Sequence, residues 1–244
     1  MSPFMSELVG TMILILLGNG VVANVVLKGT KGNSSGWIVI TTAWAFAVYV
    51  AVLVSGASGA HLNPAVTIGL AAAGKFAWGS VVPYIIAQFI GSALGALLVY
   101  TVYIDHFKVT EDEGAKRACF CTEPAIRNYR NNFISEVIGT FVLIFVILYI
   151  VGAEFAPGTA DATPIGLGSL GALPVALLVW SIGLSLGGTT GYAINPARDN
   201  APRAVLTFIG SKFNTRPDWE YGWIPCAGPV AGAILAAIVY HIFN

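Results

Sequence analysis

The amino-acid sequence predicts an all-α integral membrane protein with six transmembrane helices and two re-entrant half-helices, arranged as an inverted repeat. Three observations lead to this prediction: the scarcity of charge, the lengths of the apolar blocks, and a motif that recurs in both halves of the chain. The chain has 244 residues, of which 56% are hydrophobic and only 10% are charged. A soluble domain has about a quarter charged residues, so this composition suits a surface covered by the lipid bilayer.

The net charge and the cysteine pattern exclude several function classes. Twelve basic and 12 acidic residues give a formal net charge of zero, so we expect no nucleic-acid partner. The cysteines Cys119, Cys121 and Cys226 fit no zinc, haem or thioredoxin spacing. The first two could bind a soft metal, but ordinary loop cysteines are the simpler interpretation. Because the sequence contains no nucleophile–base pair, metal-ligand cluster or phosphate loop, we predict no enzyme, no metal and no cofactor.

Four apolar blocks have the length of a single membrane-spanning helix, which needs about 20 residues. They are residues 4–27, 76–104, 131–153 and 221–244. The first block is not expected to be a cleavable signal, because its apolar core is too long and no basic segment precedes it.

Two further blocks, residues 37–74 and 162–197, contain no Asp, Glu, Lys or Arg. Each is too long for one helix across a hydrocarbon core of about 30 Å and too short for two complete spans. Each contains the triplet Asn-Pro-Ala, as listed here: Asn63, Pro64 and Ala65, then Asn195, Pro196 and Ala197. Because Asn is a preferred helix N-cap and Pro is favoured at the first helical position, each triplet predicts the start of a new helix.

The predicted new helices are about half as long as a membrane is thick. The first should end before Gly74 and the second near Thr207, which gives roughly 16 Å at 1.5 Å per residue. A half-span with irregular backbone before it is tolerated only where it is buried in protein or lines a wet cavity.

The order of the blocks repeats along the chain. Glu7-Leu-Val-Gly-Thr in the first helix returns as Glu136-Val-Ile-Gly-Thr in the fourth. We therefore predict one domain, residues 1–244, made of a first repeat (1–104), a connecting loop (105–130) and a second repeat (131–244). Because each repeat has three spans, the second is inverted, and the half-helices meet near the membrane centre. The connecting loop has five acidic and five basic residues, which favours a solvated loop over the lining of a vestibule.

Two facing helix N-termini would create a positive potential at the midplane, because their unpaired N–H groups and dipole ends point at each other. Cations should be repelled there. Asn63 and Asn195 are expected to cap the half-helices with their side-chain oxygens, which leaves their amide N–H groups free to donate to a passing oxygen. This pattern favours a small, neutral, oxygen-bearing solute.

Four other charged or titratable residues fall in or beside the apolar blocks. Arg198 directly follows the second triplet and could orient solute hydroxyls and repel cations; the alternative is a structural pairing with Asp199. Glu7 and Glu136 could relay protons, but acceptance of backbone N–H bonds from the irregular chain before each half-helix is the favoured role. His61 could be a pH gate, although a hydrogen-bonded scaffold role is favoured.

Two longer segments resemble the signatures of the major intrinsic protein family, the aquaporins and aquaglyceroporins. They are residues 58–66 (Ser-Gly-Ala-His-Leu-Asn-Pro-Ala-Val) and residues 191–199 (Gly-Tyr-Ala-Ile-Asn-Pro-Ala-Arg-Asp). The resemblance covers essentially the whole chain, is greatest to bacterial glycerol uptake facilitators, and implies the aquaporin fold. It also implies a homotetramer in the cell (plasma) membrane, with a pore inside each subunit in which half-helix dipoles and an arginine exclude ions and protons.

The resemblance also assigns roles in a narrow selectivity filter. An Asp after the second triplet is typical of the glycerol-conducting branch of the family, and Asp199 stands at that position. Gly183 occupies the place where water-only members have a histidine, which implies a wider opening. Tyr192 and Arg198 match the filter aromatic and the filter arginine. The second-helix aromatic should lie 20 residues before Asn63, which is Ala43; Trp44 is one residue closer, so either residue could line the filter.

The sequence therefore predicts a passive channel for glycerol and other small uncharged solutes, and also for water. Protonated lactic acid, dihydroxyacetone and urea are the alternative solutes, and an open filter at Ala43 would favour them. A proton-coupled secondary transporter that uses Glu7, Glu136 and His61 is the alternative from a different class.

Overall fold

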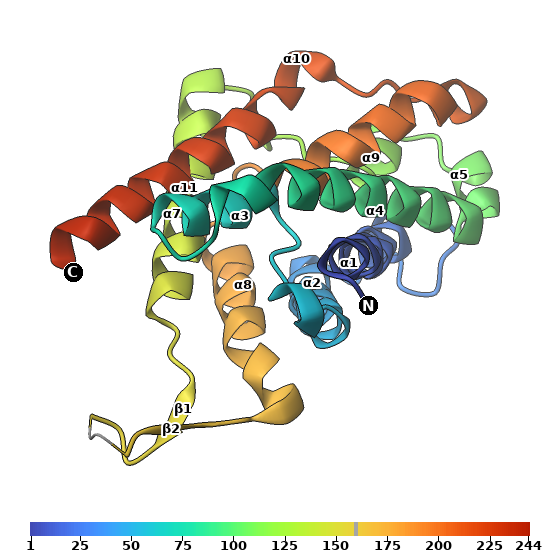
Figure 1. Ribbon diagram of the computed structural model, residues 1–244. Helices are drawn as coiled ribbons and strands as arrows, with labels where there is room; N and C mark the ends of the chain where they lie inside the picture. Colours follow the sequence, from blue (N-terminus) through green and yellow to red (C-terminus); the bar gives the residue numbers. More distant parts are fainter. Residues whose placement is uncertain (159–160) are drawn as a thin grey trace.

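The computed structural model describes residues 1–158 and 161–244, and this part of the chain forms a bundle of long helices (Figure 1). Six helical segments in it are long and apolar enough to cross a membrane. Their helices are α1 (Pro3–Val26), α2 (Trp37–Val54), α4 (Val81–Val102), α7 (Tyr129–Tyr149), α8 (Leu173–Ser185) and α11 (Ile224–Phe243). Short 3-10 turns η2 (Trp78–Ser80) and η3 (Gly168–Ala172) extend α4 and α8. The predicted all-helical membrane fold is confirmed.

Two short helices begin at the Asn-Pro-Ala triplets. α3 (Pro64–Ala72) starts after Asn63, whose Oδ1 accepts a hydrogen bond from the Ala65 backbone N–H at 2.8 Å. α9 (Pro196–Ile209) starts after Asn195, whose Oδ1 accepts from the Ala197 N–H at 3.0 Å. Each proline stands at the first helical position, where its missing N–H costs no hydrogen bond. α3 has the expected length, and α9 continues two residues past the predicted end.

The two halves of the chain use equivalent helix pairs, α1 with α4 and α7 with α11. Gly91 and Gly95 of α4 lie against the backbone of α1: a Cβ added at Gly91 would lie 2.1 Å from the Leu8 carbonyl oxygen. Gly228 and Gly232 of α11 lie against α7 in the same way, and a Cβ at Gly232 would lie 2.4 Å from the Val137 oxygen. Missing side chains let the backbones pack directly, which is a common device for helix association in membranes.

Replacing Gly91 with alanine is therefore expected to push α4 away from α1, because backbone atoms cannot move aside as a flexible side chain can. We expect the free energy of unfolding to fall by about 1–3 kcal/mol. Gly20 of α1 is the matched control, since a Cβ there would meet nothing within 4 Å, and alanine should be neutral or stabilising by up to about 1 kcal/mol. SDS titration of the two purified variants measures the difference; equal losses would contradict the close-packing account.

The connection between the halves is more buried than a solvated loop. It contains α5 (Ile104–Val109) and α6 (Glu113–Ala118), followed by a segment, residues 119–122, that is buried in the bundle. The Phe120 ring packs on Phe107 and Phe213, with centroids 5.6 and 6.0 Å away. The expectation of a wholly solvated loop is therefore wrong for this segment, because its apolar side chains complete an aromatic cluster.

A β-hairpin replaces the beginning of the predicted long block 162–197. β1 (Ala153–Phe155) pairs antiparallel with β2 (Thr163–Ile165), and the hairpin extends beyond the ends of α7 and α8 (Figure 1). Pro164 and several glycines oppose helix formation in this stretch, so the span begins only at η3. Short turns η1 (Gly56–Ser58), η4 (Gly210–Phe213) and α10 (Trp219–Gly222) complete the described structure.

Candidate functional site

The N-termini of α3 and α9 meet inside the bundle and are joined by their own asparagines. Asn63 Nδ2 donates to the Ile194 carbonyl at 2.8 Å, and Asn195 Nδ2 donates to the Leu62 carbonyl at 2.9 Å. The expectation that both amide groups are wholly free is thus corrected: one hydrogen of each NH₂ binds the other repeat, and one is left to donate to a solute.

The irregular segments before the half-helices are tied to two buried glutamates. Glu7 accepts hydrogen bonds from Ser58 Oγ, the His61 and Leu62 backbone N–H groups and Gln88 Nε2, at 2.6–2.9 Å. Both carboxylate oxygens are occupied, so Glu7 has the geometry of a support for the irregular chain rather than of a proton carrier.

The second repeat uses the same device. Glu136 accepts hydrogen bonds from Thr190 Oγ1 and the backbone N–H groups of Ala193 and Ile194, at 2.7–3.0 Å. The two carboxylates therefore fix the two chain segments whose carbonyls receive the asparagine hydrogen bonds.

A cavity of about 270 Å³ runs along this meeting point. Asn63, Asn195 and Arg198 supply polar atoms, and the remaining wall is mainly apolar. Representative apolar lining residues from five different helices are Leu14, Val48, Val66, Leu143 and Val179. A mainly apolar cavity with a few convergent polar groups is suited to small amphipathic molecules.

The cavity wall includes three large aromatic or charged side chains, Trp44, Tyr192 and Arg198, which we call the aromatic–arginine cluster. The Arg198 guanidinium carbon lies 4.4 Å from the centroid of the Trp44 ring, in a cation–π contact. Ala43 is not among the cavity-lining residues, so of the two alternatives the structure brings Trp44 to the cavity. Gly18 of α1 makes this possible, since a Cβ there would lie 2.3 Å from the Trp44 ring.

Gly183 does not leave open space, as the sequence suggested, because the Tyr192 ring occupies it. A Cβ at Gly183 would lie 2.9 Å from Tyr192 Cζ, and one at Gly187 would lie 2.4 Å from Tyr192 Cδ1. Trp37 contacts both residues: its ring meets the Tyr192 ring edge-on at a centroid distance of 5.8 Å, and its indole N–H donates to the Gly183 carbonyl at 3.1 Å. Gly183 therefore acts on the cavity wall through the position of Tyr192.

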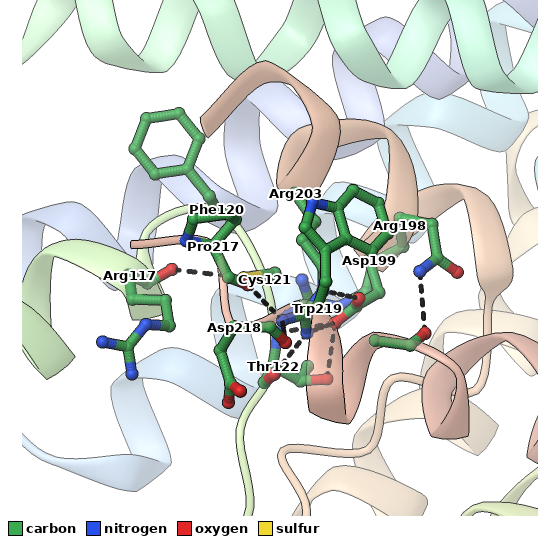
Figure 2. Close-up of polar contacts among 12 residues, drawn as sticks. Arg117, Phe120, Cys121, Thr122, Arg198, Asp199, Arg203, Pro217, Asp218 and Trp219 are labelled. Atoms are coloured by element: carbon green, nitrogen blue, oxygen red, sulfur yellow. Dashed lines mark hydrogen bonds and ion pairs between the residues drawn. The ribbon is translucent and has the colours of Figure 1, made fainter. Parts of the chain in front are cut away.

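Asp199 binds Arg203 rather than Arg198 (Figure 2). Arg203 Nε lies 2.8 Å from Asp199 Oδ1, and both side chains are fully buried. The remaining Arg203 donors bind the carbonyls of Thr122, Pro217 and Asp218, while Asp199 accepts from the Thr122 N–H and hydroxyl. This pair fastens the connecting segment and the chain after α9 to α9 itself, next to Arg198.

His61 lies in the cavity wall and is packed on one side. Its Nδ1 is 3.1 Å from Thr67 Oγ1, and its ring contacts Phe76 and Tyr84 at centroid distances of 4.5 and 5.0 Å. These contacts are those of a scaffold residue.

Cys121 lies close to the Asp199 and Arg203 pair, but neither it nor Cys119 is poised for chemistry. Burial raises the pKa of Cys121 to about 12 and raises that of Cys119 well above its ordinary value. Both thiols are therefore protonated near neutral pH, which disfavours metal binding and redox reactions.

Three residues of the site were not predicted from the sequence: Arg203, Asn19 and Trp37. Arg203 was detectable, because an Asp and an Arg four residues apart share one face of a helix. Asn19 was also detectable, because it is a polar residue inside the first apolar block. It is buried and accepts a hydrogen bond from Arg198 Nη1 at 3.3 Å. Trp37 gave no local signal, because its contacts are with Gly183 of α8 and with Tyr192, both distant in the sequence.

Comparison with known proteins identifies relatives over the full length of the chain. A family profile described as "Major intrinsic protein" matches residues 1–240. The glycerol uptake facilitator protein of Streptococcus pneumoniae is 50% identical over 244 residues, which are 100% of both chains. The D/L-lactic acid transporter of Lactiplantibacillus plantarum is 39% identical and covers 98% of this chain and 96% of that protein.

A solved structure is similar to this chain in fold and in sequence. The X-ray structure of the aquaglyceroporin from Plasmodium falciparum matches with a TM-score of 0.79 and 32% sequence identity, over 97% of this chain and 93% of that one. The profile, the full-length relatives and this structure agree with the six spans and the paired half-helices. The chain belongs to the major intrinsic protein family and is a multi-pass membrane channel, not an enzyme.

Proposed function

We propose that this chain conducts glycerol and other small uncharged solutes, together with water, down their gradients across the cell membrane. The observation that supports this best is the aromatic–arginine cluster, in which the Arg198 guanidinium lies over the Trp44 ring and Tyr192 lines the same cavity. Aromatic faces suit the carbon edge of a polyol, while the guanidinium donates hydrogen bonds to its hydroxyls. In this proposal Trp44, Tyr192 and Arg198 form the selectivity filter, and Gly183 gives Tyr192 its place.

The same path is proposed to reject ions and protons. The N-termini of α3 and α9 direct their positive dipole ends at the place where Asn63 and Asn195 meet, and Arg198 adds a full positive charge. A neutral solute can exchange its water for the free amide hydrogens of the two asparagines, whereas a cation is repelled at both points. Both oxygens of the Glu7 and Glu136 carboxylates already accept hydrogen bonds from the protein, which favours a channel over a proton-coupled transporter.

Stopped-flow light scattering on proteoliposomes tests the proposal. After a glycerol gradient is imposed, vesicles with the protein should re-swell much faster than empty vesicles, and uptake should stop at equal concentrations. Glycerol flux no greater than that of empty vesicles would refute the proposed substrate. Accumulation against a gradient would instead support the transporter.

Tyr192→Phe is expected to leave glycerol flux unchanged, although the filter residue itself is altered. The Tyr192 hydroxyl is buried against Gly183 and has no hydrogen-bond partner within residues 1–158 and 161–244. Removing an unpaired buried hydroxyl should be neutral or stabilising by about 1 kcal/mol. Flux measurements and SDS titration check both points, and a large loss of flux would mean that the hydroxyl binds the solute.

Protonated lactic acid is a second candidate solute, because the lactic acid transporter named above covers nearly the whole chain. The neutral acid should pass the positive midplane, and the lactate anion should be held there or excluded. Uptake of labelled lactate should therefore rise as the external pH falls, whereas glycerol flux should not. Dihydroxyacetone and urea belong in the same series of solutes.

We also propose that residues 1–244 act as one channel domain, with repeats 1–104 and 131–244 joined by residues 105–130. The cavity is lined by both repeats of a single chain, so each subunit would hold its own path, and the assembly would be a homotetramer as in other family members. Native mass spectrometry in detergent tests the subunit number.

A further inference from the structure

Asn19 links the filter arginine to the buried connecting segment. It lies on α1 and is fully buried. Its Oδ1 accepts a hydrogen bond from Arg198 Nη1 at 3.3 Å, and its Nδ2 donates to the Phe120 carbonyl at 3.1 Å. Phe120 is itself fixed by the aromatic cluster with Phe107 and Phe213. Both ends of the Asn19 amide are therefore held, so its oxygen has a defined position beside the guanidinium.

Asn19 is the single side chain found to accept a hydrogen bond from the Arg198 guanidinium in residues 1–158 and 161–244. The adjacent carboxylate of Asp199 is bound to Arg203 and Thr122 instead. Arg198 is therefore oriented by a neutral acceptor on one side and by the Trp44 ring on the other. An amide can fix a guanidinium without cancelling its charge, whereas a carboxylate partner would neutralise it.

We propose that Asn19 is a positioning residue of the filter: it holds the Arg198 guanidinium over Trp44 while leaving its positive charge uncompensated. The inference rests on the proposed role of Arg198 in glycerol conduction and ion exclusion. Its neighbour Gly18 seats the Trp44 ring, so two successive residues of α1 set the positions of both groups.

Asn19→Asp separates the two parts of this role, because it keeps the side-chain shape and adds a negative charge. With the guanidinium field cancelled, we expect the K⁺ conductance of planar bilayers to rise at least about tenfold over wild type near neutral pH. The current should fade as the pH is lowered and the introduced carboxylate takes up a proton. A residue with a purely structural role would produce no such pH-dependent current.

Asn24→Asp is the matched control on the same helix. Asn24 Oδ1 accepts from the Gly32 backbone N–H at 3.2 Å, whereas the hydrogen bond from the Arg198 guanidinium goes to Asn19. The introduced carboxylate keeps that acceptor, so the K⁺ conductance should stay at the wild-type level.

Asn19→Leu removes the acceptor without adding charge and provides a second readout. The freed guanidinium should bind polyol hydroxyls less specifically, so the ratio of glycerol flux to erythritol flux should change at least about threefold. If Asn19→Asp does not fold, the ratio of glycerol flux to erythritol flux in Asn19→Leu tests the role of Asn19 by itself. Absence of glycerol flux in the wild type would defeat the proposed function itself. A conducting wild type with a cation-tight Asn19→Asp and an unchanged ratio in Asn19→Leu would overturn the role of Asn19 alone.

Discussion

Replacing Arg203 with methionine is expected to lower the free energy of unfolding by about 3–5 kcal/mol, the typical cost of removing one partner of a buried ion pair. The substitution leaves the Asp199 carboxylate buried without its cation and leaves the carbonyls of Pro217 and Asp218 without their donor. SDS titration in mixed micelles measures the loss. It should be accompanied by exposure of the segment after α9 to proteases.

Two comparisons identify the cause of this loss. The double variant Asp199→Asn with Arg203→Met removes both charges and should be more stable than Arg203→Met alone, because no unpaired charge remains. Lys108→Met breaks the Lys108–Asp105 ion pair, whose side chains are 65% and 85% exposed, and should cause no measurable change. A loss for Arg203→Met as small as that for Lys108→Met would contradict the account of the Asp199 and Arg203 pair.

Arg198→Ala is expected to make the channel permeable to cations while it still conducts glycerol. A unit charge about 4 Å from a passing cation contributes roughly 4 kcal/mol of repulsion at an effective dielectric constant near 20. Half-helix dipoles remain in the variant, so we expect a rise in K⁺ conductance of at least about tenfold rather than the full effect. The Arg198 backbone N–H keeps its bond to Asn195 Oδ1, so the start of α9 should be preserved.

Arg198→Lys separates charge from shape. It keeps the positive charge, so cations should stay excluded, but an ammonium group lacks the planar fork of the guanidinium. Discrimination between glycerol and erythritol should therefore weaken. Planar-bilayer currents and vesicle swelling measure the two properties, and complete ion exclusion by Arg198→Ala would assign exclusion to the half-helices alone.

The half-helices could be predicted from the sequence because their causes are local. An Asn followed by Pro specifies a helix start through the geometry of neighbouring residues, and the structure begins α3 and α9 at those prolines. The membrane-spanning helices were predictable for a similar reason, because the length of an apolar segment decides whether it can cross the bilayer. Length did not predict the hairpin, because the apolar block near Pro164 is continuous with the helix that follows.

The direction of the proposed filter side chains could not be predicted, because it depends on residues far away in the chain. Spacing left Ala43 and Trp44 as alternatives, and a helix turns about 100° between successive residues. The structure favours Trp44 because Gly18 of α1 leaves room for its ring. Likewise, an open space at Gly183 was a fair inference from one residue, but Tyr192 comes from another segment and fills it.

If solute passes through the cavity inside a single chain, chemical block of a cysteine placed in the cavity wall should stop the flux. Val48 lines the cavity, whereas Val50 on the same helix is 37% exposed on the outside of the bundle. After treatment with a small mercurial, Val48→Cys should lose most of its glycerol flux, while Val50→Cys and the wild type, whose own cysteines serve as background, should keep theirs. Unchanged flux through Val48→Cys that mass spectrometry shows to be fully labelled would contradict this pathway.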